Sequence, residues 1–186
     1  MRKWLYCILL TAMVLPMVSC RRAVEKARRN IRLEAEQMRT LVEQMLTLAR
    51  ADNGVRPAAM EPVNLSDVAT DCALAFEPVA FEAGKPLEDH IADEVAVTGD
   101  ADRLRRLASI LLDNAVKYGA EGGAISLTLE KTERQARLTV ANPGEPIPPE
   151  HLAHLFERFY RADSSRGEKS GFGLGLSIAD TIAKEH

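Results

Sequence analysis

This chain has few cysteines and histidines, and its net charge is small. Its three cysteines among 186 residues are widely separated and odd in number, which predicts neither a disulfide framework nor a metal site. They are Cys7, Cys20 and Cys72. Lys and Arg number 24 against 27 Asp and Glu, and both signs are spread along the chain, so general nucleic-acid binding is not expected. No internal repeat or low-complexity tract is present. The four histidines are His90, His151, His154 and His186, so none lies in the first part of the chain.

What the chain does contain is typical of a folded protein. Hydrophobic residues make up 46% and charged residues 27%, within the range of globular domains. The length suffices for one domain with an appendage.

Residues 1–20 form a separate segment. Arg2 and Lys3 precede an uncharged run at 4–20, which as a helix would reach about 25 Å, near the short limit for crossing a bilayer. Such a run predicts a membrane anchor. The alternative is a secretory signal, because Ser19 and Cys20 loosely match a lipoprotein cleavage site.

Residues 21–51 lack glycine and proline and predict a long helix. Apolar residues recur every seven positions, with a second row beside them. They are Val24, Ile31, Met38 and Met45, then Ala35, Val42 and Ala49, with Leu41 and Leu48 adjacent. This seam is typical of helices that pair with other helices, and we favour a dimer over packing onto the following domain. Asn53-Gly54 would end the helix, and 54–63 reads as a linker.

The rest of the chain mixes helices and strands without regular alternation. Ser66 is the expected N-cap of a helix at 66–83, and Asp100 that of a helix at 101–118. Strands are expected at 86–91, 95–98, 124–129 and 136–141, and helices at 150–156 and 174–184. The expected buried face of the 101–118 helix is Leu104, Leu107, Ile110, Leu111 and Ala115. This order predicts an α+β fold, a two-layer sandwich with a mixed sheet packed on helices, rather than a doubly wound parallel sheet.

Three short constellations carry chemistry. Asn114 and Lys117 share a helix face, and an amide oxygen can bind a hard cation while the ammonium suits phosphate. Asn142 ends a strand and could accept a hydrogen bond from an adenine amino group. Gly144 would let the base approach the backbone. Glycines at 171, 173 and 175 expose backbone N–H groups before a helix, an arrangement that favours anions.

In this order and spacing, the constellations resemble the ATP-binding domain of sensor histidine kinases. That domain belongs to a wider ATPase superfamily with gyrase, Hsp90-type chaperones and mismatch-repair ATPases, and the resemblance runs from about Leu33 to His186. LLDNAVKY looks like the N box, VANPGEPIPPEHL the G1 box, LFERFYRAD the F box and GFGLGLSIA the G2 box. The resemblance assigns ATP contacts to Asn114, Lys117, Tyr118, Asn142, Gly144, Ile147, Phe156, Arg158, Phe159, Tyr160, Arg161, Gly171, Phe172, Gly173, Leu174, Gly175 and Leu176, with Mg²⁺ on Asn114. Arg158, Arg161 or Lys169 from the segment 145–170, which has the length of a lid, could approach the triphosphate.

The resemblance also implies an organisation. Residues 64–186 would form a C-terminally incomplete ATP-binding catalytic domain with a Bergerat-type fold, and 21–53 the second helix of a dimerisation hairpin. Expected cofactors are ATP and Mg²⁺. Expected partners are a response regulator, a kinase partner chain or second copy through 21–51, and a membrane through 4–20, but no nucleic acid. An ATP-using domain belongs in the cytoplasm, which favours an anchor in a bacterial inner membrane over a cleaved signal.

Some positions depart from the family pattern. Asn142 replaces the usual aspartate, and Pro146 a glycine. Ile110 stands where hydrolysing relatives carry a glutamate base, which predicts no fast ATPase activity. The first hairpin helix with its phosphoacceptor histidine is missing, so the catalytic acceptor is expected to come from another chain. The alternatives are a non-catalytic nucleotide-binding module that docks on a full kinase, an anti-sigma-type serine kinase, and a fragment of a longer protein.

Overall fold

The computed structural model describes the backbone of residues 2–52, 60–133, 135–162 and 171–186. Side chains are described in these ranges except at 2–23 and 50–52. The chain divides into two units, Met1–Met45 and Leu46–His186, and each is described by itself.

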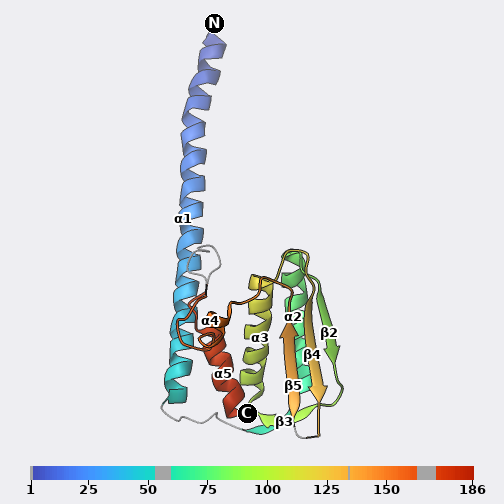
Figure 1. Cartoon of the computed structure of the whole chain (residues 1–186). Helices are drawn as coiled ribbons and strands as arrows, with labels where there is room; N and C mark the ends of the chain where they lie inside the picture. The colour runs from blue at the N-terminus through green and yellow to red at the C-terminus, as the bar shows by residue number, and fades with distance from the viewer. Residues whose placement is uncertain (1, 53–59, 134, 163–170) are drawn as a thin grey trace. The chain divides into compact units, whose positions relative to one another are not determined.

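The first unit is formed by α1 (Arg2–Asp52), which continues into the second unit (Figure 1). The predicted helix at 21–51 is confirmed, and it begins earlier than predicted. The apolar seam is exposed at Val24, Ile31, Met38 and Met45. The predicted helix end at 53–54 lies outside the described residues, as do the side chains of the predicted anchor.

No helix was found, among the residues that the search for membrane spans could describe, with the length and apolar character needed to cross a bilayer.

The second unit is a mixed α+β fold, which confirms the predicted class. Its elements after the end of α1 are β1 (Glu61–Asn64), α2 (Leu65–Glu82), β2 (Leu87–Ile91), β3 (Ala96–Gly99), α3 (Ala101–Tyr118), β4 (Ile125–Lys131), β5 (Ala136–Ala141), α4 (Pro149–Leu152) and α5 (Gly175–Glu185). β4 pairs parallel with β2 and antiparallel with β5, and β1 pairs antiparallel with β3. The main sheet is therefore mixed.

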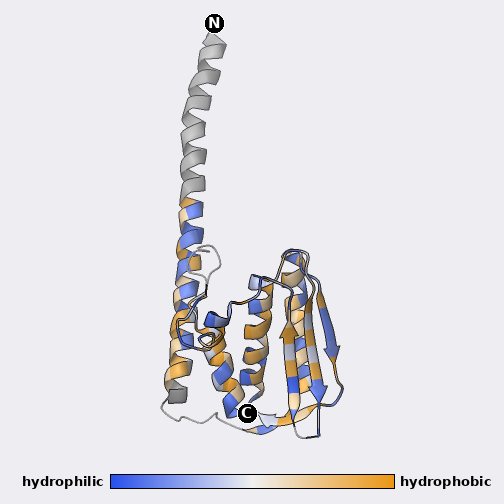
Figure 2. Ribbon diagram, in the orientation of Figure 1, coloured by the Kyte–Doolittle hydropathy of each residue, from blue (hydrophilic) through white to orange (hydrophobic). Residues whose placement is uncertain are grey.

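Helices cover one face of the β2-β4-β5 sheet. α2 and α3 pack on each other and on the sheet, and α5 packs on α3 (Figure 1). Side chains of β4 alternate, with Ile125, Leu127 and Leu129 buried toward Leu112 of α3. The same alternation is visible as bands along the ribbon in Figure 2. The core therefore lies between the sheet and its helix layer, as in a two-layer sandwich.

Cys72 of α2 lies in this core as a free thiol. Burial raises the pKa of this thiol above its ordinary value of 9.0. Because the thiolate is the reactive form, the Cys72 side chain is chemically quiet at neutral pH.

The start of α2 differs from the prediction. Asn64, and not Ser66, is the N-cap, and its side chain accepts a hydrogen bond from the Ser66 amide at 3.1 Å. Ser66 is buried instead. Its hydroxyl donates to the carbonyl of Ala92 (2.6 Å) and accepts from the amide of Val95 (3.0 Å). Both residues suit an N-cap, and the tertiary contacts of Ser66 decide between them.

α3 begins where predicted, with Asp100 accepting from the amides of Asp102 and Arg103. The predicted buried face is partly wrong. The fully buried residues are Leu104, Ala108, Leu112 and Ala115, whereas Leu107, Ile110 and Leu111 are half-buried. The small residue Ala108 faces the core because α2 and the sheet approach closely there, which an apolar pattern that favours large residues does not reveal.

The far end of α5 is fixed to the start of α3. Arg103 forms an ion pair with Glu185, and the ring of His186 accepts a hydrogen bond from the Asp100 amide at 3.0 Å. At the other end, a Cβ on Gly175 would lie 3.4 Å from a methyl of Ile110. The two helices are therefore antiparallel neighbours, and the N-terminus of α5 faces the middle of α3.

Other boundaries shift by a few residues. β1 occupies residues that the sequence analysis placed at the end of a linker, and α4 is shorter than the predicted 150–156 helix. The β1 pairing with β3 is a contact between distant segments, so a four-residue strand containing Pro62 gives little local signal.

Candidate functional site

Asn114 and Lys117 lie in the last turns of α3. The Nδ2 atom of Asn114 is buried, and in the part of the chain that is described it has no hydrogen-bond partner. Lys117 pairs with Asp113 one turn earlier, with 2.6 Å between Nζ and Oδ2. Both partners are part-exposed, so this pair contributes little to stability. The end of α3 thus presents an unsatisfied amide beside a cation whose partner is exchangeable.

The segment after β5 docks against the end of α3. The Ala120 amide donates to the carbonyl of Pro143 at 2.7 Å. A Cβ on Gly144 would lie 3.2 Å from the carbonyl of Tyr118, and one on Gly119 would lie 3.5 Å from the Cβ of Asn142. The predicted adenine segment and the predicted metal and phosphate segment are therefore neighbours, although 28 positions separate Asn114 from Asn142 along the chain.

The glycine run contacts the segment predicted to be the F box. The Phe159 amide donates to the carbonyl of Gly173 at 2.8 Å. Gly173 has φ +68°, and a Cβ there would lie only 2.7 Å from backbone atoms of Phe159 and Tyr160. Only glycine meets both conditions without strain. The Phe159 backbone is itself left-handed, with φ +65°.

Taken together, these contacts join the four predicted boxes. The N box and the G1 box meet at the end of α3, and the F box and the G2 box meet at Gly173. Gly175 brings the start of α5 against Ile110, one turn before Asn114. An unsatisfied amide, glycine N–H groups at a helix start and a nearby cation are the groups that a metal-bound polyphosphate requires.

A family profile matches the chain over residues 99–186. Its description is "Histidine kinase-, DNA gyrase B-, and HSP90-like ATPase". The chain contains an ATPase domain of this family. The matched range begins just before α3 and includes every residue assigned to the four boxes.

Relatives of this ATPase domain are sensor kinases. The chain is 36% identical over 153 residues to the sensor protein DltS of Streptococcus agalactiae serotype V, which covers 82% of this chain and 39% of that protein. It is 40% identical over 154 residues to the sensor histidine kinase CusS of Escherichia coli O6:H1, covering 82% of this chain and 32% of CusS. The chain thus spans about two fifths or less of the length of these relatives.

A solved structure shares the arrangement. The crystal structure of full-length ShkA in complex with AMPPNP superposes with a TM-score of 0.66 at 27% identity, over 78% of this chain and 30% of that chain. The predicted resemblance to histidine kinase ATP-binding domains is confirmed.

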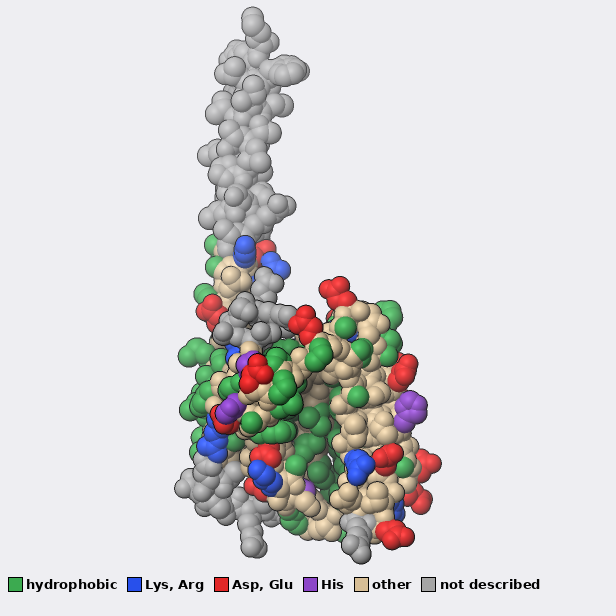
Figure 3. Space-filling model, in the orientation of Figure 1, with side chains coloured by type: hydrophobic (Ala, Val, Ile, Leu, Met, Phe, Trp, Pro, Cys, Tyr) green, Lys and Arg blue, Asp and Glu red, His purple; other side chains and the backbone are tan. Residues whose placement is uncertain are grey.

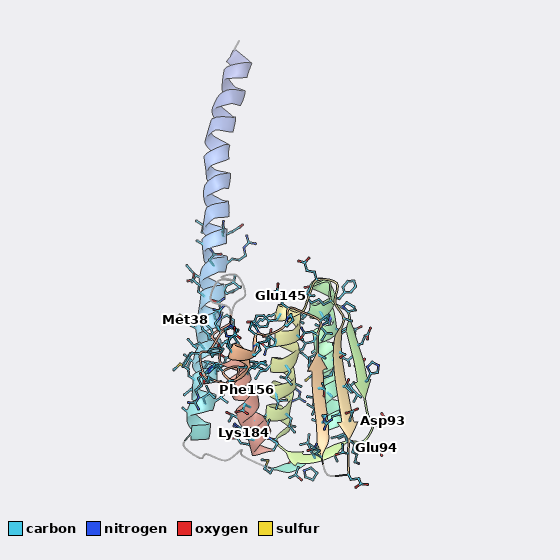
Figure 4. The ribbon with its side chains drawn as sticks, in the orientation of Figure 1. Met38, Asp93, Glu94, Glu145, Phe156 and Lys184 are labelled. Atoms are coloured by element: carbon cyan, nitrogen blue, oxygen red, sulfur yellow. The ribbon has the colours of Figure 1, made fainter. Side chains whose placement is uncertain are left out.

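The lid segment of the ATPase domain carries apolar side chains on its surface. The exposed ones near the site are Ile147, Leu152, Phe156, Phe159 and Phe172. Figure 3 shows hydrophobic side chains gathered over α4 and its surroundings. Figure 4 places Phe156 in this region. Glu145 is labelled beyond it, and both residues lie away from the turn at Asp93 and Glu94.

The residues assigned to ATP contacts differ in how far their side chains are exposed. The side chain of Leu174 is buried, and Leu176 is half-buried. Tyr118 is exposed at the end of α3. Arg158 and Arg161 are exposed, and each takes part in a hydrogen bond or another contact within the protein. Lys169 lies outside the described residues.

Sequence reasoning missed several polar side chains near the site. Asp113 pairs with Lys117, and its spacing of four residues was the available signal. In the lid, His151 Nδ1 lies 2.6 Å from the Tyr160 hydroxyl, and His154 Nδ1 lies 2.7 Å from Glu157. These contacts fold the lid on itself.

A metal site made of protein side chains alone is not found among the described residues. Among the residues whose side chains could be searched, no group of three or more His, Cys, Asp or Glu could hold a metal ion. Asn114, the residue assigned to Mg²⁺, has an unpaired Nδ2 atom, and rotating its amide would place the oxygen, which can bind a metal, in the same position.

Proposed function

We propose that this chain binds Mg-ATP at the junction of α3, α5 and the segment after β5, and acts as the catalytic domain of a sensor histidine kinase. The observation that carries the proposal is the orphaned amide of Asn114, because buried polar groups are almost always paired in folded proteins. A nucleotide oxygen that accepts from Nδ2 would satisfy it, and with the amide rotated its oxygen would face a metal instead.

Each residue of the site would contact the part of Mg-ATP that suits its chemistry. Asn114 would contribute an amide oxygen to Mg²⁺, and Lys117 would exchange Asp113 for phosphate. The backbone around Gly171, Gly173 and Gly175 would hold phosphate oxygens, and Asn142 with Gly144 the adenine. Bound Mg²⁺ supplies charge neutralisation on the phosphates. Phosphoryl transfer depends chiefly on such positioning and electrostatics, so the chain needs no strong base.

The acceptor histidine would come from another chain. No histidine precedes His90, and the helix that resembles half of a dimerisation hairpin contains none. The exposed seam at Ile31, Met38 and Met45 would pair with the same seam of a second copy or with a kinase partner. A response regulator would receive the phosphoryl group next. Residues 4–20 would hold the assembly in a bacterial inner membrane, with the ATPase domain in the cytoplasm.

The test uses the purified full chain. It should bind Mg-ATP, seen as a rise in melting temperature with ligand concentration, since a ligand that binds only the folded state stabilises it. It should not label itself with γ-labelled ATP. Adding a kinase chain that carries the acceptor helix should produce an acid-labile, alkali-stable label on that chain. Self-labelling of the isolated chain with this stability would refute transfer in trans, and no thermal shift would refute the nucleotide site.

A non-catalytic, regulatory role is the second candidate. Ile110 favours it, because no glutamate base stands at that position and hydrolysis is not expected. Capture of an intact kinase together with Mg-ATP binding, but no label on any histidine, would select this role.

A further inference from the structure

Lys85 is a buried cation outside all four boxes. Lys85 is only 7% exposed and lies in the turn that joins α2 to β2. Gly84, with φ +68°, ends α2, and the Lys85 amide donates to the carbonyl of Ala80 at 2.9 Å. The backbone of Lys85 is therefore fixed by the end of one helix. A buried ammonium is costly unless it is hydrogen-bonded, so its partner is informative.

The Lys85 ammonium reaches the last turn of α3. Nζ donates to the carbonyl of Val116 at 2.5 Å. Val116 lies between Asn114 and Lys117, the two residues assigned to metal and phosphate. The last carbonyls of a helix lack partners within the helix and carry partial negative charge, which suits a lysine. Lys85 thus caps α3 from a neighbouring element.

The two amides that follow Val116 near this cap, those of Gly119 and Ala120, have different partners. The Gly119 amide continues the helical pattern and donates to the carbonyl of Ala115 at 2.9 Å. The next step would join the Ala120 amide to the carbonyl of Val116. Instead, the Ala120 amide donates to the carbonyl of Pro143 at 2.7 Å. The backbone turns out of the helix at Gly119, where ψ is 150°, so the Lys85 ammonium occupies the Val116 carbonyl while the Ala120 amide holds the segment after β5.

We infer that Lys85 is a positioning residue for nucleotide binding. By taking the Val116 carbonyl, its ammonium lets Ala120 fix Pro143, and so sets the distance between Asn142 and Gly144 on the adenine side and Asn114 on the metal side. The inference rests on the proposed function.

The test compares two substitutions of Lys85 with a matched surface lysine. Lys85→Met removes the donor and keeps the length, and Lys85→Arg keeps a cationic donor. The control is Lys184→Met on α5, where the lysine side chain is 75% exposed. Figure 4 labels Lys184 near the end of that helix. The Kd for Mg-ATP is measured on the full chain, at a temperature where circular dichroism shows each variant folded.

We expect Lys85→Met to raise the Kd roughly tenfold, a loss typical of a residue that orients binding groups. Lys85→Arg should recover most of the affinity, and Lys184→Met should leave it unchanged. Should Lys85→Met fail to fold, Lys85→Gln replaces it with the same expectation, because its side chain is too short to reach the Val116 carbonyl. A folded Met or Gln variant with wild-type Kd overturns the inference.

A double-mutant cycle separates positioning from general support. Asn142→Ala removes the group that Lys85 is inferred to position, so the two losses in affinity should fail to multiply in Lys85→Met/Asn142→Ala. Losses that multiply fully would overturn the route through Pro143. A wild-type chain without Mg-ATP binding would refute the proposed function as well, whereas normal wild-type binding with an unaffected Lys85 variant refutes this inference alone.

Discussion

At the residue scale, Asn114 holds hydrogen-bonding capacity that the folded chain does not use. Leaving a buried polar group unpaired costs about 1–3 kcal/mol. A protein that keeps such a buried atom unpaired gives up stability that an apolar side chain of similar shape would restore. Stability and ligand binding are therefore opposed at this position.

Replacing Asn114 with leucine tests this opposition. The variant should be as stable as the wild type or more stable by about 1 kcal/mol, because the orphaned amide is gone. It should lose the rise in melting temperature with Mg-ATP. Thermal melts with and without ligand measure both effects. A destabilised variant that still responds to Mg-ATP would show that the amide serves packing alone.

Asp113 and Lys117 show what the sequence could and could not predict about single residues. The pattern of the four boxes placed Asn114, Lys117 and the glycines correctly in neighbouring segments. It did not predict that Lys117 is paired with Asp113, or that Lys85 reaches Val116 from another element. Both contacts depend on side-chain directions in the folded state, and Lys85 lies 31 positions from its partner.

At the element scale, α2 begins with two polar residues that have different tasks. Asn64 satisfies the Ser66 amide in an exposed cap, whereas the Ser66 hydroxyl joins the carbonyl of Ala92 and the amide of Val95 in the interior. The cap is local, and the Ser66 contacts hold the β2–β3 turn onto the helix.

The two substitutions Ser66→Ala and Asn64→Ala should therefore differ. Ser66→Ala removes the partners of the part-buried carbonyl of Ala92 and of the buried amide of Val95, and should cost about 2–3 kcal/mol. Asn64→Ala removes one cap and should cost about 1 kcal/mol. Urea unfolding of both variants measures the difference. Equal costs, or a larger cost for Asn64→Ala, would contradict the assignment of Ser66 to the interior.

The glycine run offers a second comparison between neighbouring positions. Gly173→Ala places a methyl 2.7 Å from the backbone of Phe159 and Tyr160 at a positive φ, and should destabilise the packing of the lid on α5 by about 1–3 kcal/mol. Gly171→Ala meets no atom within 4 Å and should leave the free energy of unfolding unchanged. Limited proteolysis of the lid and thermal melts check the pair, and equal behaviour would contradict the close contact at Gly173.

Element types were more predictable than their boundaries. Asp100 and the apolar pattern of α3 are local signals, and the helix lies at the predicted residues. β1 was missed because its only support is pairing with β3, more than thirty positions away. α4 was predicted too long because the residues after Leu152 form turns that are shaped by contacts such as His151 with Tyr160.

At the scale of the whole molecule, α1 exposes Val24, Ile31, Met38 and Met45 of its seam, whereas Leu48, which was assigned to the same seam, is buried. If this seam forms a dimer, Ile31→Glu with Met38→Glu should convert the full chain to monomers, because two charges would be buried at the interface. Thr40→Glu, an exposed position on the opposite side of the same helix from Ile31, is the control and should leave the dimer intact. Light scattering after gel filtration measures the mass. A wild-type chain that is monomeric at high concentration would refute pairing through this seam.

The attachment of α5 to α3 is uneven along the length of the helix, and this has a mechanical consequence. The Arg103–Glu185 ion pair and the hydrogen bond of His186 with Asp100 clamp one end, and Ile178 and Ile182 anchor the middle. The opposite end bears the small residues Gly171, Gly173 and Gly175. The residues just before α5 contact the segment predicted to be a lid, because the Phe159 amide donates a hydrogen bond to the carbonyl of Gly173. A group that binds at these glycines would therefore act directly on that segment, while the far end of α5 stays held to α3.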